Sequence, residues 1–561
     1  MKFDPVLVHD WLTRTARLLP DKTALISRGQ RLTYREIEEK ASNLASALVL
    51  MGFRKGDRAI ICLDNCPEAV ISIYGVIKAG GIFVAVEPKS PWPVLSSIIK
   101  DTGARFLITH RLKLFGREGL KEEARLPARG FQVIVVDGSP SVFQPCPKVL
   151  EFSRLTKKVE SSVSLPGLLE TDLACLVYTS GSTGKPKGII CTHHNMVAAA
   201  RSVIQYLGNK RHDIILDVLP LPFGYGLYQV IMCFMFGGTV VLEPSFAYIQ
   251  DILTTIEKEK VTGFPIVPSI SAMLLSLKKF PEEQLKSLRY ITNAGAAWPV
   301  SHIQQLRKLL PKVKLFNMYG LSECKRVSYL PPNLIDKYPE SVGIPMPNIE
   351  VAIVDQRGKP VPVGQTGELI VRGPSVMQGY WRDKNLTRKV FKKGKYAADR
   401  WLYTGDLFRQ DENGLLYFVG RRDRQIKSFG RRINLAEIEK TVSCLEGVLE
   451  AAAVPVPDDL GGEVVGLFVV GQKGSKIDEA QVKLFCQQHL EPYKIPRYIL
   501  LMEALFRTPN GKVDYQKLIN FLKKTGIKGV LENSVEKEKK TSEAELIGKE
   551  QAKGTPDKSA K

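Results

Sequence analysis

One glycine- and hydroxyl-rich segment has the composition of a phosphate-binding loop. It runs from Tyr178 to Gly188, reads YTSGSTGKPKG and directly follows an apolar stretch. Glycines let the backbone approach a ligand, hydroxyl and backbone N–H groups donate to phosphate oxygens, and lysines add positive charge. Because Lys185 is followed by Pro186 where a Walker A loop has Ser or Thr, the segment belongs to another class. It predicts a phosphate site, with a flexible Gly/Ser loop as the alternative.

Four further motifs follow this loop along the chain. They are Asn317–Glu323 (NMYGLSE), Tyr403–Asp406 (YTGD), Gly420–Asp423 with Ile426–Gly430 (GRRD and IKSFG), and Thr508–Asp514 (TPNGKVD). Each motif is weak alone, but five of them in this order are highly specific. Together they resemble the adenylate-forming superfamily, which contains acyl-CoA synthetases, aryl-CoA ligases, nonribosomal adenylation domains and luciferases. The resemblance extends from about residue 10 to residue 518.

The resemblance implies an ATP-dependent reaction of a carboxylic acid. In this family a carboxylate attacks the α-phosphorus of ATP to give acyl-AMP and pyrophosphate, and a thiol then displaces AMP. Because the first step brings two anions together, the site must supply positive charge and orientation. The resemblance implies that Lys512 bridges the substrate carboxylate and the α-phosphate. It also implies that Glu323 binds Mg²⁺, which prefers oxygen ligands, and that Lys187 takes part in catalysis.

The nucleotide site follows from the same resemblance. Tyr319 is expected to stack on adenine, and Asp406 is expected to accept hydrogen bonds from both ribose hydroxyls, with Arg421 supporting the ribose. Without these roles, Lys512 would be an ordinary exposed lysine, and Glu323 and Asp406 would be solvated or capping carboxylates. The residues expected at the nucleotide and its phosphates also include Thr179, Ser180, Gly181, Ser182, Thr183, Gly184, Lys187 and Ser322.

The identity of the acid is only partly specified. Phe223 stands where the family often has His, which removes an acid–base role. Gly224 stands where amino-acid-activating relatives have Asp, and a buried ammonium without a partner is costly, so an α-amino acid is disfavoured. Alignment to the family places around the acyl group Phe223, Tyr225, Phe264, Asn293, Ala294, Gly295, Ala296 and Met318. These mostly apolar, small walls predict a fatty or aryl acid.

The C-terminal motifs imply a moving domain and a thiol acceptor. Asp423 resembles the hinge about which the family's small domain rotates between the two half-reactions. Gly430 would leave room for a pantetheine arm, and Arg432 would contact the substrate side of the hinge loop. The interval between Glu323 and Asp406 lacks the insertion of carrier-loading relatives. Coenzyme A is therefore the expected acceptor, and a separate acyl carrier protein is the alternative.

The elements that position these motifs alternate between strand and helix. Thr33 and Glu36 form a capping box before an amphipathic helix. Strand and helix patterns alternate from about residue 58 to 109 and from 173 to 309, which predicts βαβ units and mostly parallel sheets. Between about 342 and 418, short strands separated by Gly, Pro and Asp turns predict a small antiparallel unit, and a small α+β unit follows.

These patterns predict an α/β protein in three parts. Residues 1–422 form a large adenylation domain, built from doubly wound βαβ subdomains and the small β-barrel-like unit. Residues 423–528 form a small mobile α+β lid that carries Lys512. Residues 529–561 are rich in Lys, Glu and Ser and are predicted to be a disordered tail.

Composition limits the class of protein and of partner. The 561 residues are 44% hydrophobic and 25% charged, which is ordinary for a globular protein and excludes a collagen-like or disulfide-scaffold chain. Eighty Lys and Arg against 58 Asp and Glu give a net charge of +22, which suits anionic substrates. Because these basic residues are scattered, no nucleic-acid partner is predicted.

Cysteine usage and the N-terminus predict the compartment. Nine cysteines without metal-ligand spacing indicate a reduced protein, and the N-terminal residues do not form a signal peptide. The most apolar run, residues 230–242, is too short to span a bilayer. We therefore predict a cytoplasmic protein without a transmembrane segment, whose basic surface remains compatible with peripheral membrane contact.

The sequence thus predicts an AMP-forming acyl-CoA synthetase of fatty acid metabolism that uses ATP, Mg²⁺ and coenzyme A. The first alternative is a stand-alone ligase that loads an acyl or aminoacyl group onto a carrier protein. The second is a nucleotide-binding protein that acts through its basic surface without catalysis. The presence of Lys512, Glu323 and Asp406 together argues against the second, because binding alone does not require all three.

Overall fold

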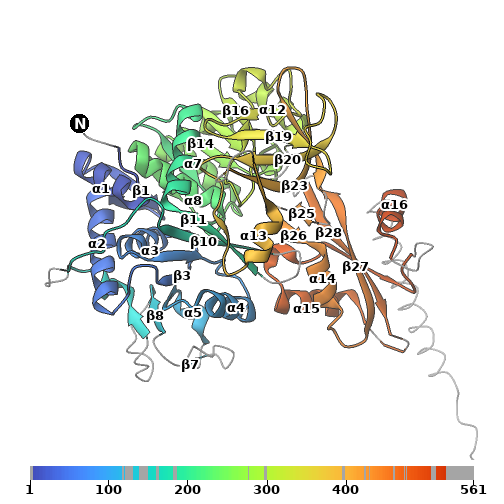
Figure 1. Cartoon of the computed structure of the whole chain (residues 1–561), viewed down its shortest axis with the longest axis horizontal. Helices are drawn as coiled ribbons and strands as arrows, with labels where there is room; N and C mark the ends of the chain where they lie inside the picture. Colours follow the sequence, from blue (N-terminus) through green and yellow to red (C-terminus); the bar gives the residue numbers. More distant parts are fainter. Residues whose placement is uncertain are drawn as a thin grey trace, which may run out of the picture.

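The computed structural model describes most of the chain, apart from short internal segments and the C-terminal residues. Figure 1 shows a large body that begins at the N-terminus and a smaller unit, formed by α14–α16 and β25–β28, on the side away from α1 and α2. The described residues are 4–116, 119–120, 131–137, 149–158, 163–180, 186–275, 277–295, 298, 300–394, 399–421, 425–428, 430–458, 462–472, 474–475, 477–506 and 513–525.

The first sheet is parallel in its centre. Its order is β18-β17-β16-β15-β14-β12-β13-β1-β2, with parallel pairs from β16 to β1 and antiparallel pairs at both ends. Its strands are β1 (Thr23–Ser27), β2 (Gln30–Thr33), β12 (Ile214–Asp217), β13 (Thr239–Leu242), β14 (Gly263–Ile266), β15 (Tyr290–Asn293), β16 (Lys314–Tyr319), β17 (Ser328–Tyr329) and β18 (Ile344–Pro345).

The second sheet is also mostly parallel and carries the phosphate-loop motif. Its order is β21-β11-β10-β4-β3-β5-β8-β9, parallel from β10 to β9 and antiparallel at β11 and β21. Its strands are β3 (Arg58–Cys62), β4 (Ile82–Ala85), β5 (Phe106–Thr109), β8 (Gln132–Val135), β9 (Val149–Glu151), β10 (Leu173–Ser180), β11 (Pro186–Thr192) and β21 (Gly379–Tyr380). The predicted parallel sheets are thus confirmed.

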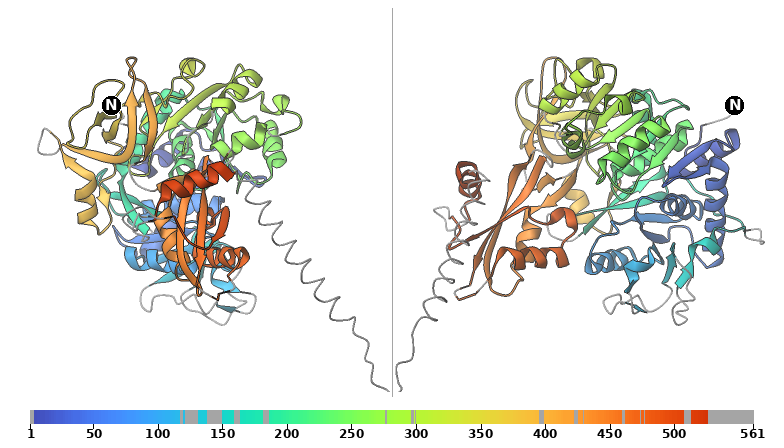
Figure 2. Two further views of the ribbon diagram at one scale, coloured as in Figure 1. Left: turned by 90° about the vertical axis from the view of Figure 1, so that its right-hand side faces the viewer. Right: turned by 180° about the vertical axis from the view of Figure 1, so that it is seen from behind.

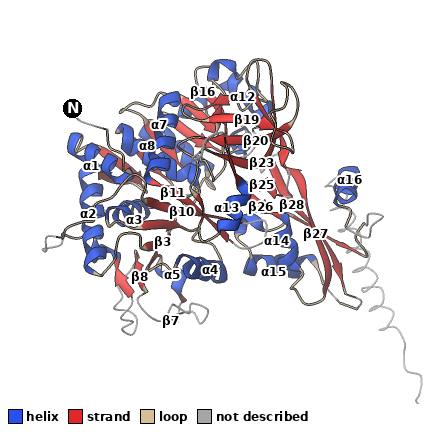
Figure 3. Ribbon diagram, in the orientation of Figure 1, coloured by secondary structure: helices blue, strands red, loops and turns tan. Residues whose placement is uncertain are grey.

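Both faces of the second sheet are buried, as parallel sheets require. Along β3, Ala59 and Ile61 join the core that is shared with the first sheet, whereas Ile60 and Cys62 join the core beside α4 (Trp92–Thr102). Figure 3 shows the helices, in blue, around the strands, in red. The helices of this region are α1 (Val8–Leu18), α2 (Tyr34–Leu50), α3 (Pro67–Lys78), α7 (His193–Leu207) and α8 (Gly224–Phe236).

The helix α8 lies in the shared core and ties α2 to the first sheet. The Tyr34 hydroxyl donates to the backbone carbonyls of Cys233, at 3.1 Å, and of Gly238, at 2.7 Å, while its ring packs edge-on against Phe234. The predicted capping box at Thr33 and Glu36 begins α2. The apolar run 230–242 is therefore a buried segment, as predicted, and no helix in the described parts of the chain is long and apolar enough to cross a membrane.

Two smaller sheets follow. The antiparallel sheet predicted between 342 and 418 is confirmed, with the order β19-β20-β23-β22 and β24 paired to β23. The last sheet has the order β26-β25-β28-β27, with β29 parallel to β28. Their strands are β19 (Glu350–Val354), β20 (Gly367–Arg372), β22 (Phe391–Lys393), β23 (Arg400–Gln410), β24 (Leu416–Arg421), β25 (Gln425–Ser428), β26 (Arg431–Asn434), β27 (Val448–Asp458), β28 (Gly462–Gly471) and β29 (Tyr498–Met502).

The last sheet is covered on both faces. On β28, Val465 and Leu467 join one apolar cluster, with α14 (Leu435–Val442) and α15 (Glu479–His489), while Val464 and Phe468 join another, with α16 (Tyr515–Thr525). Figure 2 shows this unit at the side of the molecule in both turned views. The domain boundary predicted at residues 422 and 423 stays a prediction, because residues 422–424 and the tail 529–561 lie outside the described residues.

The remaining described elements connect these sheets. They are α5 (Arg111–Leu114), β6 (Phe115–Gly116), β7 (Gly119–Leu120), α6 (Phe152–Leu155), α9 (Ile249–Glu259), α10 (Pro268–Leu275), α11 (Glu282–Leu285), α12 (Val300–Leu309), the 3₁₀ turn Pro332–Leu334, α13 (Lys384–Val390) and the 3₁₀ turn Pro492–Lys494.

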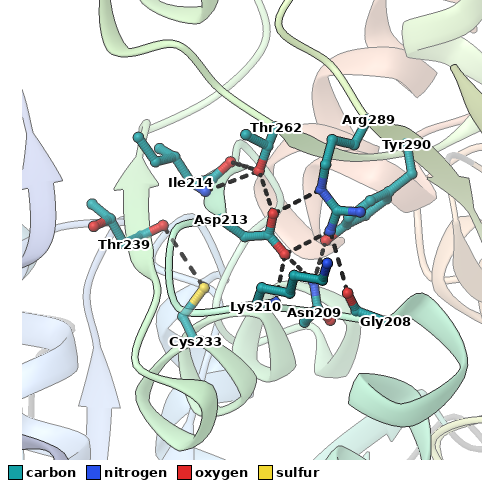
Figure 4. A network of polar contacts seen from close by, with 10 residues as sticks. All are labelled: Gly208, Asn209, Lys210, Asp213, Ile214, Cys233, Thr239, Thr262, Arg289 and Tyr290. Carbon is teal, nitrogen blue, oxygen red and sulfur yellow. Dashed lines mark hydrogen bonds and ion pairs between the residues drawn. The ribbon is translucent and has the colours of Figure 1, made fainter. Parts of the chain in front are cut away.

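A buried ionic network aligns the amino ends of β12, β14 and β15 (Figure 4). The Asp213 carboxylate accepts hydrogen bonds from the Arg289 guanidinium at 2.8 and 2.6 Å, and from the Lys210 backbone N–H at 2.8 Å. The Thr262 hydroxyl donates to the same carboxylate at 3.1 Å and accepts the Ile214 N–H at 3.0 Å. Burial alone would raise the pKa of Asp213, but the bonds from Arg289 and Lys210 outweigh it and lower the pKa.

We expect Asp213→Ala to lower the free energy of unfolding by about 3 kcal/mol, because it removes the counter-charge of a partly buried guanidinium and the acceptor of the Lys210 backbone N–H. The low end of the usual range applies, since the Arg289 side chain is 32% exposed. The folded pKa lies below the unfolded one, so this stabilisation is present above the unfolded pKa and is lost as the pH falls through the folded pKa. Denaturant unfolding at neutral and acidic pH measures both effects; equal stabilities at neutral pH would contradict the role.

Candidate active site

A cavity lies between the two large sheets and the C-terminal unit. It contains about 1220 Å³ of empty space, its open mouth included. The segments at the carboxyl ends of the parallel strands β4, β10, β15 and β16 line it, which is the usual position of a ligand site in open α/β sheets. The hairpin β25–β26 of the last sheet closes one side of the cavity through Lys427, Gly430 and Arg431.

The phosphate-loop motif is the turn of the antiparallel hairpin β10–β11. Thr179 pairs with Lys187, so the two side chains leave adjacent strands at the same level. Thr179 and Pro186 line the cavity, which places the end of β10 and the start of β11 at its edge. The tip of the turn, residues 181–185, lies outside the described residues and includes the predicted phosphate ligands Gly181, Ser182, Thr183 and Gly184.

Three hydrogen bonds anchor this hairpin through Asp101 and Trp381. The Tyr178 hydroxyl donates to the Asp101 carboxylate at the end of α4. The Trp381 indole N–H donates to the Asp101 backbone carbonyl at 3.2 Å, and the Trp381 backbone N–H donates to the Gly188 carbonyl at 2.7 Å. Burial, followed by the hydrogen bond to Asp101, raises the pKa of Tyr178, so the phenol stays protonated and keeps donating.

Glu323 lies beside the other strand of the hairpin. It follows β16, is buried, and accepts a hydrogen bond from the Tyr380 hydroxyl at 3.0 Å. Tyr380 belongs to β21, where it pairs with Ile189 of β11. The backbone carbonyl of Glu323 also accepts the Met377 N–H at 2.7 Å. The strand that pairs with the one carrying Lys187 therefore carries the contact that orients the Glu323 carboxylate.

Tyr319 and Asp406 meet where the first sheet contacts the antiparallel sheet. The Tyr319 hydroxyl donates to the fully buried Asp406 carboxylate at 2.5 Å. The ring of Tyr319 contacts Phe408 edge-on, with centroids 4.7 Å apart, and the Lys427 ammonium lies 5.1 Å from the ring centroid. Asp406 of β23 pairs with Arg421 of β24, whose side chain is not described. Residues from three sheets thus meet at this point.

The predicted acyl-pocket residues separate into three groups. Those that line the cavity are Phe223, Tyr225, Ala294 and Gly295. Those that are buried without belonging to its described lining are Phe264, Asn293 and Met318. Ala296 lies outside the described residues. The strands explain this division, because Phe264, Asn293 and Met318 lie within β14, β15 and β16, whereas the lining residues follow strand ends or begin α8.

The hairpin β25–β26 contacts the large body at the cavity. A Cβ atom on Gly295 would lie 3.0 Å from the Gly430 Cα, and a Cβ atom on Gly430 would lie 3.1 Å from Val267. Both glycines have positive φ, so a larger residue at either would be strained as well as crowded. The Arg431 guanidinium forms a 2.5 Å ion pair with Glu87, which follows β4. Of the other C-terminal predictions, Asp423 and Lys512 lie outside the described residues, as does the side chain of Arg432.

The comparisons with known proteins agree with this arrangement. Residues 12–381 match the family of AMP-binding enzymes, and residues 437–512 match the AMP-binding enzyme C-terminal domain. The chain is an adenylate-forming enzyme of this family. The family model for the main domain includes the β10–β11 hairpin and Glu323, whereas Asp406 falls between the two matched ranges.

Curated relatives of this adenylate-forming enzyme cover nearly its whole length. The long-chain-fatty-acid–CoA ligase of Bacillus subtilis (strain 168) is 31% identical over 538 residues, which cover 91% of this chain and 93% of the relative. A linear gramicidin synthase of Brevibacillus parabrevis is 30% identical over 519 residues, or 91% of this chain but 6% of that much longer protein. The relatives thus include both a CoA ligase and a peptide synthase.

Solved structures show the same fold. The o-succinylbenzoate CoA synthetase of Bacillus subtilis superposes with a TM-score of 0.78 and 27% identity, covering 91% of this chain and 98% of that one. The amide bond synthetase McbA of Marinactinospora thermotolerans superposes with a TM-score of 0.81 and 25% identity, covering 91% and 99%. The predicted superfamily and fold class are therefore confirmed.

Three cationic residues of the adenylate-forming enzyme's cavity were not predicted from sequence. Lys325 and Arg326 lie two and three positions after Glu323, and Lys494 follows α15; all three line the cavity. Lys494 forms buried ion pairs of 2.7 Å with Glu437 and with Glu491. Lys325 donates to the Ser322 carbonyl at 3.1 Å. The available signal was a pair of basic residues between the Glu323 motif and the short run of residues 327–330, where buried charged groups need partners.

Proposed function

We propose that this adenylate-forming enzyme is an AMP-forming acid–thiol ligase, which activates a carboxylic acid with ATP and transfers the acyl group to coenzyme A. The observation that carries the proposal is the cavity bordered by the β10–β11 hairpin, Phe223 and the β25–β26 hairpin. The names of two relatives, a fatty-acid–CoA ligase and an o-succinylbenzoate CoA synthetase, support the choice of coenzyme A.

In the first half-reaction, a carboxylate oxygen of the acid bonds to the α-phosphorus of ATP while the bond to pyrophosphate breaks. Thr179, Lys187 and the turn between them would bind the phosphates, and Asp406 would accept the ribose hydroxyls. Lys512 would neutralise the charge that builds between carboxylate and α-phosphate. Ordered donors lower the barrier here because they need no reorganisation as the bond forms.

Glu323 fits the divalent ion that the family implies. Mg²⁺ usually takes one or two carboxylates together with phosphate oxygens and water. The Glu323 carboxylate is buried beside the strand that carries Lys187, and Tyr380 orients one of its oxygens. The ion would neutralise the charge of the β- and γ-phosphates, and Glu323 would hold it against the hairpin.

In the second half-reaction, the thiol sulfur bonds to the acyl carbon while AMP leaves. We assign the contact between Gly430 and Gly295 to this step, because only glycines let the two backbones approach so closely and thereby seat the β25–β26 hairpin against the cavity. Rotation at Asp423 would then exchange this hairpin for the loop that carries Lys512. One arrangement of the small unit would thus lower the barrier to adenylation, and a second arrangement would lower the barrier to thioester formation at the same cavity.

The Glu87–Arg431 ion pair should favour the second half-reaction only. Its side chains are 18% and 20% exposed, and a pair of this kind contributes about 1 kcal/mol. We therefore expect Arg431→Ala and Glu87→Gln to slow thioester formation from supplied acyl-AMP about fivefold, while pyrophosphate release stays unchanged. The charge swap Glu87→Arg with Arg431→Glu should restore part of the rate. Equal effects on both half-reactions would exclude this role.

Pyrophosphate release with Mg²⁺-ATP tests the proposed function. Fatty, aryl and amino acids are each offered with and without coenzyme A, and the products are identified by mass. Acid-dependent release together with an acyl-CoA product would support the ligase. An acyl-AMP that coenzyme A does not discharge would indicate a carrier-protein acceptor, and no release with any acid would contradict the proposal.

A further inference from the structure

Arg326 places a positive charge in the wall of the cavity. The side chain is 7% exposed, and it forms no ion pair with any residue that the structure describes. Its Nε atom is buried and makes no hydrogen bond within the described part of the chain. The guanidinium lies 4.7 Å from the centroid of the Tyr225 ring, and Tyr225 is a predicted acyl-pocket residue that lines the cavity.

The surroundings of Arg326 are aromatic and held in place. The Tyr225 hydroxyl donates to the Thr292 carbonyl at 2.9 Å, which fixes the ring beneath the guanidinium. Tyr206 lies within hydrogen-bonding reach of Arg326 and stacks on Tyr329, with ring centroids 4.0 Å apart. These rings interact favourably with a cation, and the Tyr206 hydroxyl can accept from the guanidinium, but the buried Nε–H remains without an acceptor among the described residues.

The carboxyl group of Asp217, which lies near Tyr225 in this part of the core, is a weak source of counter-charge. Asp217 is fully buried, and burial raises the pKa of its carboxyl well above the ordinary value, which disfavours the charged form. One of its oxygens accepts the Leu219 backbone N–H at 3.1 Å. Since arginine remains protonated in proteins and an unpaired buried charge is costly, Arg326 needs an acceptor from the ligand.

We propose that Arg326 selects acids that carry a second carboxylate, at the end of the molecule away from the carboxylate that is adenylated. This inference rests on the proposed function and narrows its substrate class. The planar guanidinium matches a carboxylate and can bind both of its oxygens. Tyr225 and Phe223 would contact the apolar part between the two carboxylates. The sequence prediction of a plain fatty or aryl acid omitted this residue.

Matched pairs of acids test the proposal. Pyrophosphate release is measured with hexanoate against adipate, decanoate against sebacate, and benzoate against isophthalate, at saturating Mg²⁺-ATP. We expect kcat/KM in at least one pair to favour the diacid about tenfold or more. Arg326→Leu should lower kcat/KM for that diacid about 10- to 100-fold, the range for loss of a charge-assisted hydrogen bond, and should leave the matched monoacid equal or better.

Two further variants separate specificity from folding. Arg326→Lys keeps the charge without the planar fork, and it should fall between wild type and Arg326→Leu with the diacid. Arg307→Leu removes an arginine that pairs with Asp336 away from the cavity lining, and it should leave the acid preference unchanged. Thermal unfolding of Arg326→Leu should match or exceed that of the wild type, because an apolar residue replaces an unpaired buried charge.

The outcomes separate the proposed specificity for a second carboxylate from the proposed ligase activity. Equal losses for monoacid and diacid in Arg326→Leu would overturn it, because they would place Arg326 at the reacting carboxylate. A wild-type preference for monoacids that survives Arg326→Leu would also overturn it while leaving the ligase intact. If no acid releases pyrophosphate, calorimetry with the same diacids decides: binding lost in Arg326→Leu supports the anionic subsite, and equal binding overturns it.

Discussion

Lys512→Ala is expected to lower the rate of adenylation by at least about 100-fold, because removal of one preorganised donor costs about 10²–10³ in rate. The lysine would neutralise charge only while the carboxylate and the α-phosphate approach each other. Thioester formation from supplied acyl-AMP should therefore change little. Single-turnover pyrophosphate release measures the first step, and discharge of acyl-AMP by coenzyme A measures the second.

Lys517→Ala is the matched control. Lys517 lies five positions further on in α16, is 63% exposed, and pairs with Asp514 at 3.8 Å. Its removal should leave both half-reactions within about twofold of the wild type, because an exposed pair contributes at most about 1 kcal/mol, mainly to stability. If Lys512→Ala adenylates within a few-fold of the wild-type rate, the lysine does not bridge the two anions.

Glu323→Gln should lower adenylation about 100-fold and raise the Mg²⁺ concentration needed for half-maximal rate. Gln keeps the shape of the side chain and can still accept the Tyr380 hydroxyl bond, but it removes the negative charge. A hard cation prefers a carboxylate over an amide, and metal stabilisation of the transition state amounts to several kcal/mol. Titration of pyrophosphate release with Mg²⁺ at fixed ATP measures both quantities.

Tyr380→Phe tests the orientation of the Glu323 carboxylate separately from its charge. It deletes the 3.0 Å hydrogen bond to Glu323 and keeps the aromatic ring on β21, which pairs with β11. Loss of such an orienting contact costs about tenfold, so Tyr380→Phe should lie between wild type and Glu323→Gln. An unchanged Mg²⁺ dependence in Glu323→Gln would show that the ion is held elsewhere.

Local signals predicted the regular elements well. The capping box predicted at Thr33 begins α2. The alternation of strands and helices expected from about residue 58 to 109 is the series β3, α3, β4, α4 and β5. Such elements are specified by caps, breakers and hydrophobic period, all of which lie within the segment itself. The order of strands in each sheet was not predicted, because pairs such as β1 with β13 join segments over 200 residues apart, as at Leu25 and Val240.

The motifs by themselves determined the family, because five short patterns in one order identify an adenylate-forming enzyme without any coordinates. They also named Thr179, Glu323, Tyr319 and Asp406 as candidates, and of these the tertiary structure brings Tyr319 and Asp406 into contact. Only the tertiary structure decided which side chain each of these polar groups contacts. Tyr319 meets Asp406 across two sheets, and Arg431 meets Glu87 across 344 positions of the chain.

Arg326 illustrates the physical reason for this division. A motif shows which functional groups the reaction needs, because this depends only on the types of the residues. Whether a charge is solvated, paired or left for a ligand depends on burial and on side chains brought from distant strands, and the energy of a charge depends on those surroundings. In the sequence Arg326 is one of many scattered basic residues; the fold buries it over Tyr225 in the wall of the cavity.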